Sequence, residues 1–136
     1  MTALPPTAGR RPDEDRVRLE AVRQFADCCQ AEKGHSEQVT RLALQLFDSL
    51  HAALRLNEDD RFLLECGAIL HDIGWRGGQQ GHHKTSLQMI LQDVTMPLDE
   101  SERKIVGLLA RYHRKSLPGP DHPLYGGLSE ADRRRV

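Results

Sequence analysis

Apolar side chains recur at every third or fourth position along most of this chain, and this spacing constrains the fold more than any other feature. It is the period of an α-helix with one buried face, whereas a half-buried strand alternates at every second residue. Five such stripes run over residues 17–29, 39–54, 62–73, 87–94 and 105–112. No segment shows the alternation of a strand, so the sequence predicts an all-α fold.

Capping residues and a glycine mark where these helices begin and end. Asn57 is followed three residues later by Asp60, and Asp99 by Glu102. This spacing is typical of a helix start at which two side chains bond the free backbone amides. We expect caps at both places, and we expect Gly34 to separate the first helix from the second.

Two segments rich in glycine and proline are expected to be loops. The first runs from Gly74, which we expect to end the third helix, to His82. The second runs from Ser116 to Leu128.

The 136 residues suffice for one domain with its own core. Residues 1–14 lack periodicity and predict a flexible tail, and residues 15–136 predict a single bundle of five or six helices. Ser129 and Asp132 have the spacing of a further helix start, yet the sequence stops at Val136. We therefore expect either a domain truncated at its last helix or a last helix that is vestigial.

Composition excludes several classes of protein. Nineteen basic and twenty acidic residues leave a net charge of -1, which argues against general nucleic-acid or membrane binding. No apolar run approaches the roughly 20 residues of a membrane span, and no secretory signal opens the chain. Cys28, Cys29 and Cys66 predict small buried thiols in a reducing compartment. A cytoplasmic location is expected.

The seven histidines are the most informative residues for function. His51 and His122 are interpreted as bystanders. The others stand with one aspartate at the expected helix ends: His35, His71, Asp72, His82, His83 and His113. Imidazole and carboxylate groups suit Zn, Mn or Fe, and helix ends in a bundle can converge on such an ion. Spacing alone leaves open whether these residues form a metal site or are simply scattered.

Basic residues concentrate beside two of these histidines. They are Lys84, Arg111, Arg114 and Lys115. Such positive charge beside a metal site suits a phosphate group. A solvated cationic helix end explains the last three equally well, but not Lys84, which stands at a helix start.

Four segments, in order, resemble one known family. They are HSEQVTRLALQLFDSL, LECGAILHDIGW, GHHKTSLQMIL and LLARYHRKSLP. His35 and the Leu-His-Asp-Ile-Gly segment at 70–74 resemble the HD-domain superfamily of metal-dependent phosphohydrolases. The whole pattern resembles the C-terminal HD-type domain of exopolyphosphatase/guanosine pentaphosphate phosphatase (Ppx/GppA) proteins over about residues 15 to 136.

The resemblance implies a catalytic metal site. His35, His71 and Asp72 would bind a first divalent ion (Mn, Fe, Mg, Co or Zn), and His82 or His83, with His113, a second. Such ions hold a phosphate oxygen and acidify a bound water. Three cations would offset charge on the phosphate: Lys84, Arg111 and Arg114. The implied substrate is a phosphorylated small molecule or nucleotide.

The chain departs from the family pattern in three ways. Thr85 replaces the last histidine of the usual His-His-Lys-His-Ser segment. A metal-binding aspartate expected on a later helix has no match, since neither Asp121 nor Asp132 lies at its position. The family's ATPase-like N-terminal domain, which carries the polyphosphatase chemistry, is also absent, so that activity is not transferred.

Two functions and one assembly remain open. The first function is an HD-type metal-dependent phosphohydrolase acting on a phosphate ester or anhydride. The second is a non-catalytic helical module that binds metal or a phosphorylated ligand and regulates a partner. A homodimer would result if the missing last helix left an apolar groove that a second copy fills.

Overall fold

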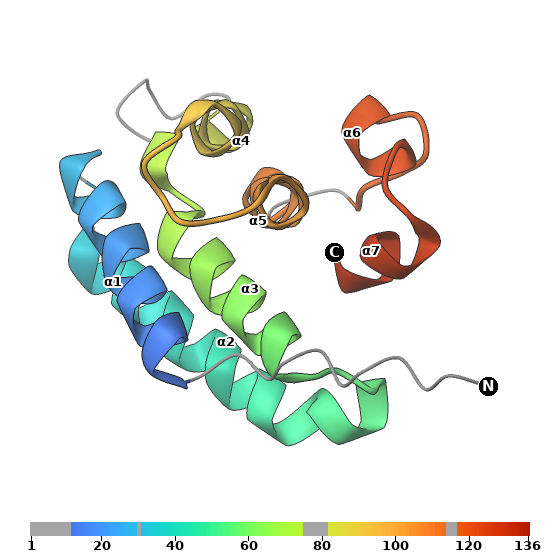
Figure 1. Ribbon diagram of the computed structural model, residues 1–136, viewed down its shortest axis with the longest axis horizontal. Coiled ribbons are helices and arrows are strands. Elements are labelled where there is room, and N and C mark those ends of the chain that lie inside the picture. The colour runs from blue at the N-terminus through green and yellow to red at the C-terminus, as the bar shows by residue number, and fades with distance from the viewer. Residues whose placement is uncertain (1–11, 30, 75–81, 114–116) are drawn as a thin grey trace.

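The computed structural model describes residues 12–29, 31–74, 82–113 and 117–136, with the backbone alone for residues 82 and 83. This part of the chain contains seven helices and no strand: α1 (Pro12–Cys28), α2 (Lys33–Leu54), α3 (Glu58–Leu70), α4 (His82–Gln92), α5 (Glu100–Arg111), α6 (Pro123–Gly126) and α7 (Glu130–Arg135). The predicted all-α fold is confirmed (Figure 1).

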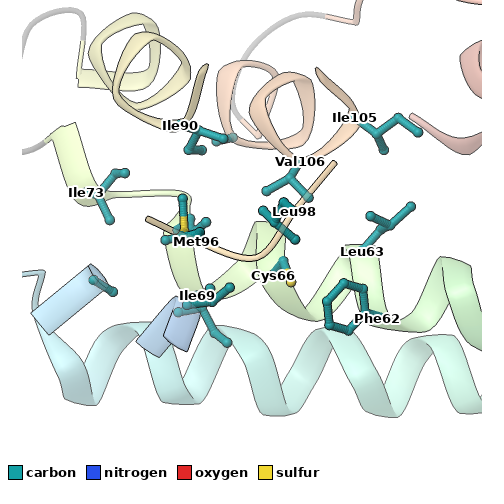
Figure 2. Packing of buried hydrophobic residues seen from close by; sticks show 14 residues of the cluster. Phe62, Leu63, Cys66, Ile69, Ile73, Ile90, Met96, Leu98, Ile105 and Val106 are labelled. Atoms are coloured by element: carbon teal, nitrogen blue, oxygen red, sulfur yellow. The ribbon is translucent and has the colours of Figure 1, made fainter. Parts of the chain in front are cut away.

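Helix α3 lies at the centre of the arrangement. It packs against α1 and α2 on one side and against α5 on the other, and α4 packs on α5 (Figure 1). Seven of its thirteen residues are buried. In Figure 2, Leu63 of α3 lies on the side of Ile105 of α5, whereas the Phe62 ring of α3 packs under the Arg18 guanidinium of α1. The core therefore surrounds α3, with buried side chains of α1 and of the α4–α5 pair packed against it.

Two glycines allow helices to approach closely. A Cβ atom on Gly107 of α5 would lie 2.6 Å from Cδ1 of Leu87 on α4. One on Gly67 of α3 would lie 3.1 Å from the side chain of Leu109 on α5. Both glycines are buried. The close α3–α5 and α4–α5 contacts therefore depend on glycine, which has no side chain, at these two positions.

The predicted caps are confirmed. At the start of α3, Asp60 N donates to Asn57 Oδ1 and Asn57 N donates to Asp60 Oδ2. Asp99 and Glu102 make the same reciprocal pair at the start of α5. At the start of α7, Asp132 N donates to the Ser129 hydroxyl. Each cap satisfies backbone amides that have no partner within the helix.

Several predicted boundaries are wrong. Gly34 lies inside α2 and does not precede it. Helix α3 ends at Leu70, and residues 71–74 form a turn and a short 3₁₀ segment, so Gly74 does not end the helix. Helix α1 starts at Pro12, within the expected tail, because proline suits the first turn of a helix. Helix α6 forms inside the expected loop at 116–128, likewise with a proline at its start.

The apolar stripe at residues 39–54 is largely exposed, although its periodicity predicts a buried helix face. On α2, Phe47 is 6% exposed, whereas Leu42, Leu46, Leu50 and Leu54 are 45–63% exposed. The cysteine prediction also fails in part. All three thiols are free, but Cys66 alone is buried, and Cys28 is exposed.

Candidate metal centre

Three helix ends converge on one carboxylate. His35 is the third residue of α2, His71 and Asp72 directly follow α3, and His113 lies two residues beyond α5. Since α3 packs against both α2 and α5, it brings these ends together. The structure thus gathers four of the six candidate metal ligands.

Asp72 lies at the centre of this cluster. Its Oδ2 atom is 3.1 Å from Nε2 of His71 and 3.2 Å from Nε2 of His35. Its Oδ1 atom is 3.5 Å from Nε2 of His113. The two nitrogens of His35 and His71 are 3.3 Å apart. One carboxylate therefore faces three imidazole nitrogens.

The backbone orients two of these rings. Nδ1 of His71 lies 2.6 Å from the carbonyl oxygen of Ala68, and Nδ1 of His113 lies 2.5 Å from that of Ala110. A carbonyl oxygen only accepts, so each Nδ1 carries the proton and donates it. In the neutral ring this leaves on Nε2 a lone pair that an ion can accept, whereas in the protonated ring Nε2 donates to the Asp72 carboxylate. The neutral form is the tautomer that a metal-binding histidine uses when a second-shell group holds its other nitrogen.

The charges in the cluster favour an ionised carboxylate. Burial alone would raise the pKa of Asp72, but hydrogen bonds from His113 and His71, together with their charges, hold it far below its ordinary value. Burial likewise lowers the pKa of His71, yet hydrogen bonds to Asp72 and to the Ala68 carbonyl outweigh burial and raise it. Asp72 is therefore an anion throughout the physiological pH range.

The donor set fits a divalent transition metal. The ligating atoms of His35, His71 and Asp72 all lie within 4.8 Å of one another. Two donors bound about 2.1 Å from one ion stand about 3.0–3.4 Å apart at tetrahedral or octahedral angles. The distances of 3.1, 3.2 and 3.3 Å agree with that requirement. Little movement would be needed to hold an ion.

The structure gives less information on the other predicted metal ligands and phosphate-binding cations. His82 and His83 are the first two residues of α4, but their side chains lie outside the described residues, as do Arg114 and Lys115. Lys84 is exposed on α4. The Arg111 guanidinium lies 4.8 Å from the centre of the Tyr112 ring.

The two expected bystanders have packing partners of their own. His51 lies in the last turn of α2, where its ring stacks on Phe47. His122 packs edge-on against Tyr112. No described contact joins either residue to the Asp72 cluster.

Sequence reasoning missed the carbonyl groups that orient the rings. Ala68 precedes His71 by three residues, and Ala110 precedes His113 by three. The signal that could have found them is this repeated Ala-x-x-His at a helix end. A small residue there leaves its carbonyl uncovered, and a ring three residues later can reach it.

The fold and this cluster define an all-helical domain of a phosphatase family. Residues 17–136 match the family described as Ppx/GppA phosphatase, domain III. The chain belongs to this family. No curated protein matches it. Within the described ranges, none of the helices is both long and apolar enough to cross a bilayer.

Proposed function

We propose that this domain is an HD-type metal-dependent phosphohydrolase acting on a phosphate ester or anhydride, with a nucleotide as a candidate substrate. The observation that carries the proposal is the convergence of Asp72 with Nε2 of His35, His71 and His113. Membership of a phosphatase family supports it.

The proposed ligands of the first ion are His35, His71 and Asp72. His113, whose Nε2 lies 3.5 Å from the other oxygen of Asp72, is proposed to bind a second ion together with His82 or His83. The ion, one of Mn, Fe, Mg, Co or Zn, would act as a Lewis acid on the phosphate and acidify a water molecule.

The other residues have separate roles in this proposal. Asp72 would bind the ion directly, and the Ala68 and Ala110 carbonyls, which accept from Nδ1 of His71 and His113, would fix the tautomers and orientations of those two rings. Lys84, Arg111 and Arg114 are proposed to offset negative charge on the phosphate as it reacts.

The test is a metal and activity survey of the whole chain. Protein stripped with a chelator is reloaded with each ion and assayed on phosphomonoesters, phosphodiesters and nucleotides. We expect turnover with at least one ion, loss of that turnover in His71→Ala, and full activity in His51→Ala. Folded protein without turnover under any condition, or equal activity in both variants, contradicts the proposal.

A second candidate is a non-catalytic module that binds metal or a phosphorylated ligand. The observation that favours it is Thr85, an exposed residue where the resembling segments carry a histidine. Threonine is a poor ligand for these metals. Under this hypothesis, His71→Ala and Asp72→Ala weaken metal or phosphate binding, while the wild-type protein shows no turnover with any ion.

A further inference from the structure

Ser86 connects the metal-site turn to the next helix. It lies on α4 and is completely buried. Its Oγ atom accepts a hydrogen bond of 2.9 Å from the backbone amide of Gly74. Gly74 lies in the 3₁₀ segment that directly follows the turn at His71 and Asp72. A buried serine on one element therefore holds the backbone of another.

This hydrogen bond joins two parts of the proposed site. Gly74 lies two residues beyond Asp72, and residues 75–81 separate it from α4 along the chain. His82 and His83 lie one helical turn before Ser86 on that helix. The bond thus fixes the turn that carries Asp72 relative to the helical turn that carries this histidine pair.

The surroundings leave the turn few alternatives to this bond. Ile73, between Asp72 and Gly74, is 1% exposed and belongs to the hydrophobic core. Gly74 is also buried, so water does not reach its amide. Without the Ser86 hydroxyl, this amide would lose the acceptor described above, at the cost of an unsatisfied buried donor. The turn would have to shift to satisfy that amide, and Asp72 would move with it.

We propose that Ser86 is a positioning residue for the metal centre, acting through the Gly74 amide to set the place of Asp72. Groups that orient metal ligands without touching the ion typically change affinity by roughly 10–100-fold when removed. The family segment His-His-Lys-His-Ser ends at this serine, but the roles predicted from the sequence fall on the histidines and basic residues alone. Its effect on metal binding rests on the proposed function.

The test compares three variants by Co²⁺ titration of metal-free protein. Ser86→Ala removes the acceptor, and Ser86→Thr keeps a hydroxyl. Ile105→Val is the control, because it weakens the same core at the end far from Ile73 (Figure 2). We expect at least tenfold weaker Co²⁺ binding in Ser86→Ala, near wild-type binding in Ser86→Thr, and unchanged binding in Ile105→Val. Equal affinity in Ser86→Ala and wild type overturns the proposal, as does an equal loss in Ile105→Val.

Amide hydrogen exchange at Gly74 supplies a second readout that needs no metal. We expect exchange at least tenfold faster in Ser86→Ala than in wild type and in Ile105→Val. Unchanged exchange overturns the role of Ser86 even where metal binds. If the wild-type protein takes up no Co²⁺, the proposed function fails, and the exchange rates still decide whether Ser86 holds the turn.

Discussion

Nε2 of His35 lies 3.2 Å from Oδ2 of Asp72, so the start of α2 is tied to the turn that follows α3. The His35 side chain is nevertheless 49% exposed, whereas the His71 side chain on the same oxygen is 8% exposed. The two histidines therefore contribute differently to the cluster: His35 closes it from the solvent side, and His71 forms part of the protein interior.

Replacing each histidine with alanine should separate metal binding from stability. We expect His35→Ala to weaken Co²⁺ binding at least tenfold while changing the free energy of unfolding of the metal-free protein by less than about 1 kcal/mol, as for exposed pairs. His71→Ala should weaken both, because it removes a buried, hydrogen-bonded ring. Urea unfolding and Co²⁺ titration measure the two quantities. Equal stability losses in the two variants would contradict this difference.

The raised pKa of His71 predicts a pH dependence of metal binding. A ligating imidazole must be neutral, so below the His71 pKa each added proton competes with the ion. Co²⁺ affinity should therefore rise, by up to about tenfold per pH unit, as the pH approaches the raised pKa of His71, and it should level off above that pKa. In the metal-free protein, the contribution of His71 to the free energy of unfolding changes with pH in the opposite direction to the metal affinity. A raised pKa contributes stability that is present below about pH 6.5 and is lost as the pH rises through the folded pKa.

Nuclear magnetic resonance titration of the histidine rings checks the cause of that shift. In Asp72→Asn the carboxylate that raises the His71 pKa is gone, and burial then dominates. The His71 titration midpoint should fall below its wild-type value, with the exposed His51 ring as the internal reference. A His71 midpoint that stays unchanged would show that Asp72 is not the cause.

Alanine substitutions at Gly107 and Gly34 provide a test of helix packing and its control. Gly107→Ala places a methyl group 2.6 Å from Leu87 Cδ1 between α4 and α5, and it should destabilise the fold by about 1–3 kcal/mol. Gly34→Ala meets nothing within 4 Å and lies in a helix, so it should stabilise by up to about 1 kcal/mol. Thermal and urea unfolding measure both. A stabilising Gly107→Ala would mean that α4 and α5 are farther apart.

The exposed stripe on α2 gives a direct test of burial. Leu46 is 63% exposed and Leu63 of α3 is 2% exposed, although both belong to helical stripes. Leu63→Ala should cost about 2–5 kcal/mol and Leu46→Ala less than about 1 kcal/mol in the free energy of unfolding of the monomer. A large, concentration-dependent cost for Leu46→Ala would instead indicate that a second copy covers this stripe, which is a different surface from the groove expected at the last helix.

Local sequence signals predicted the helices and their caps well. Asn57 with Asp60 and Asp99 with Glu102 are cap pairs whose partners lie within one turn, so their chemistry is set locally. The grouping of His35, His71, Asp72 and His113 at helix ends also follows from local pattern. The resemblance to known segments then indicated that these ends meet.

The remaining features depend on contacts that periodicity does not encode. A stripe such as that of α2 shows that a helix has an apolar face, but not which neighbour covers it. Gly34 is the second residue of α2, and a Cβ there would meet nothing within 4 Å, so a glycine alone does not mark a helix boundary. Ser86 matches the last residue of the His-His-Lys-His-Ser segment, but its contact with Gly74 arises only because the fold brings the two residues together.

The central claim is that Asp72 organises a metal site, and calorimetric titration of chelator-treated protein with Co²⁺ tests it most directly. Asp48→Asn is the matched control, because Asp48 is an exposed aspartate paired with Arg61 on another part of the surface. We predict that wild type and Asp48→Asn bind Co²⁺ equally, and that Asp72→Asn binds it at least tenfold more weakly. Absence of binding in wild type, or equal binding in Asp72→Asn, would contradict the claim.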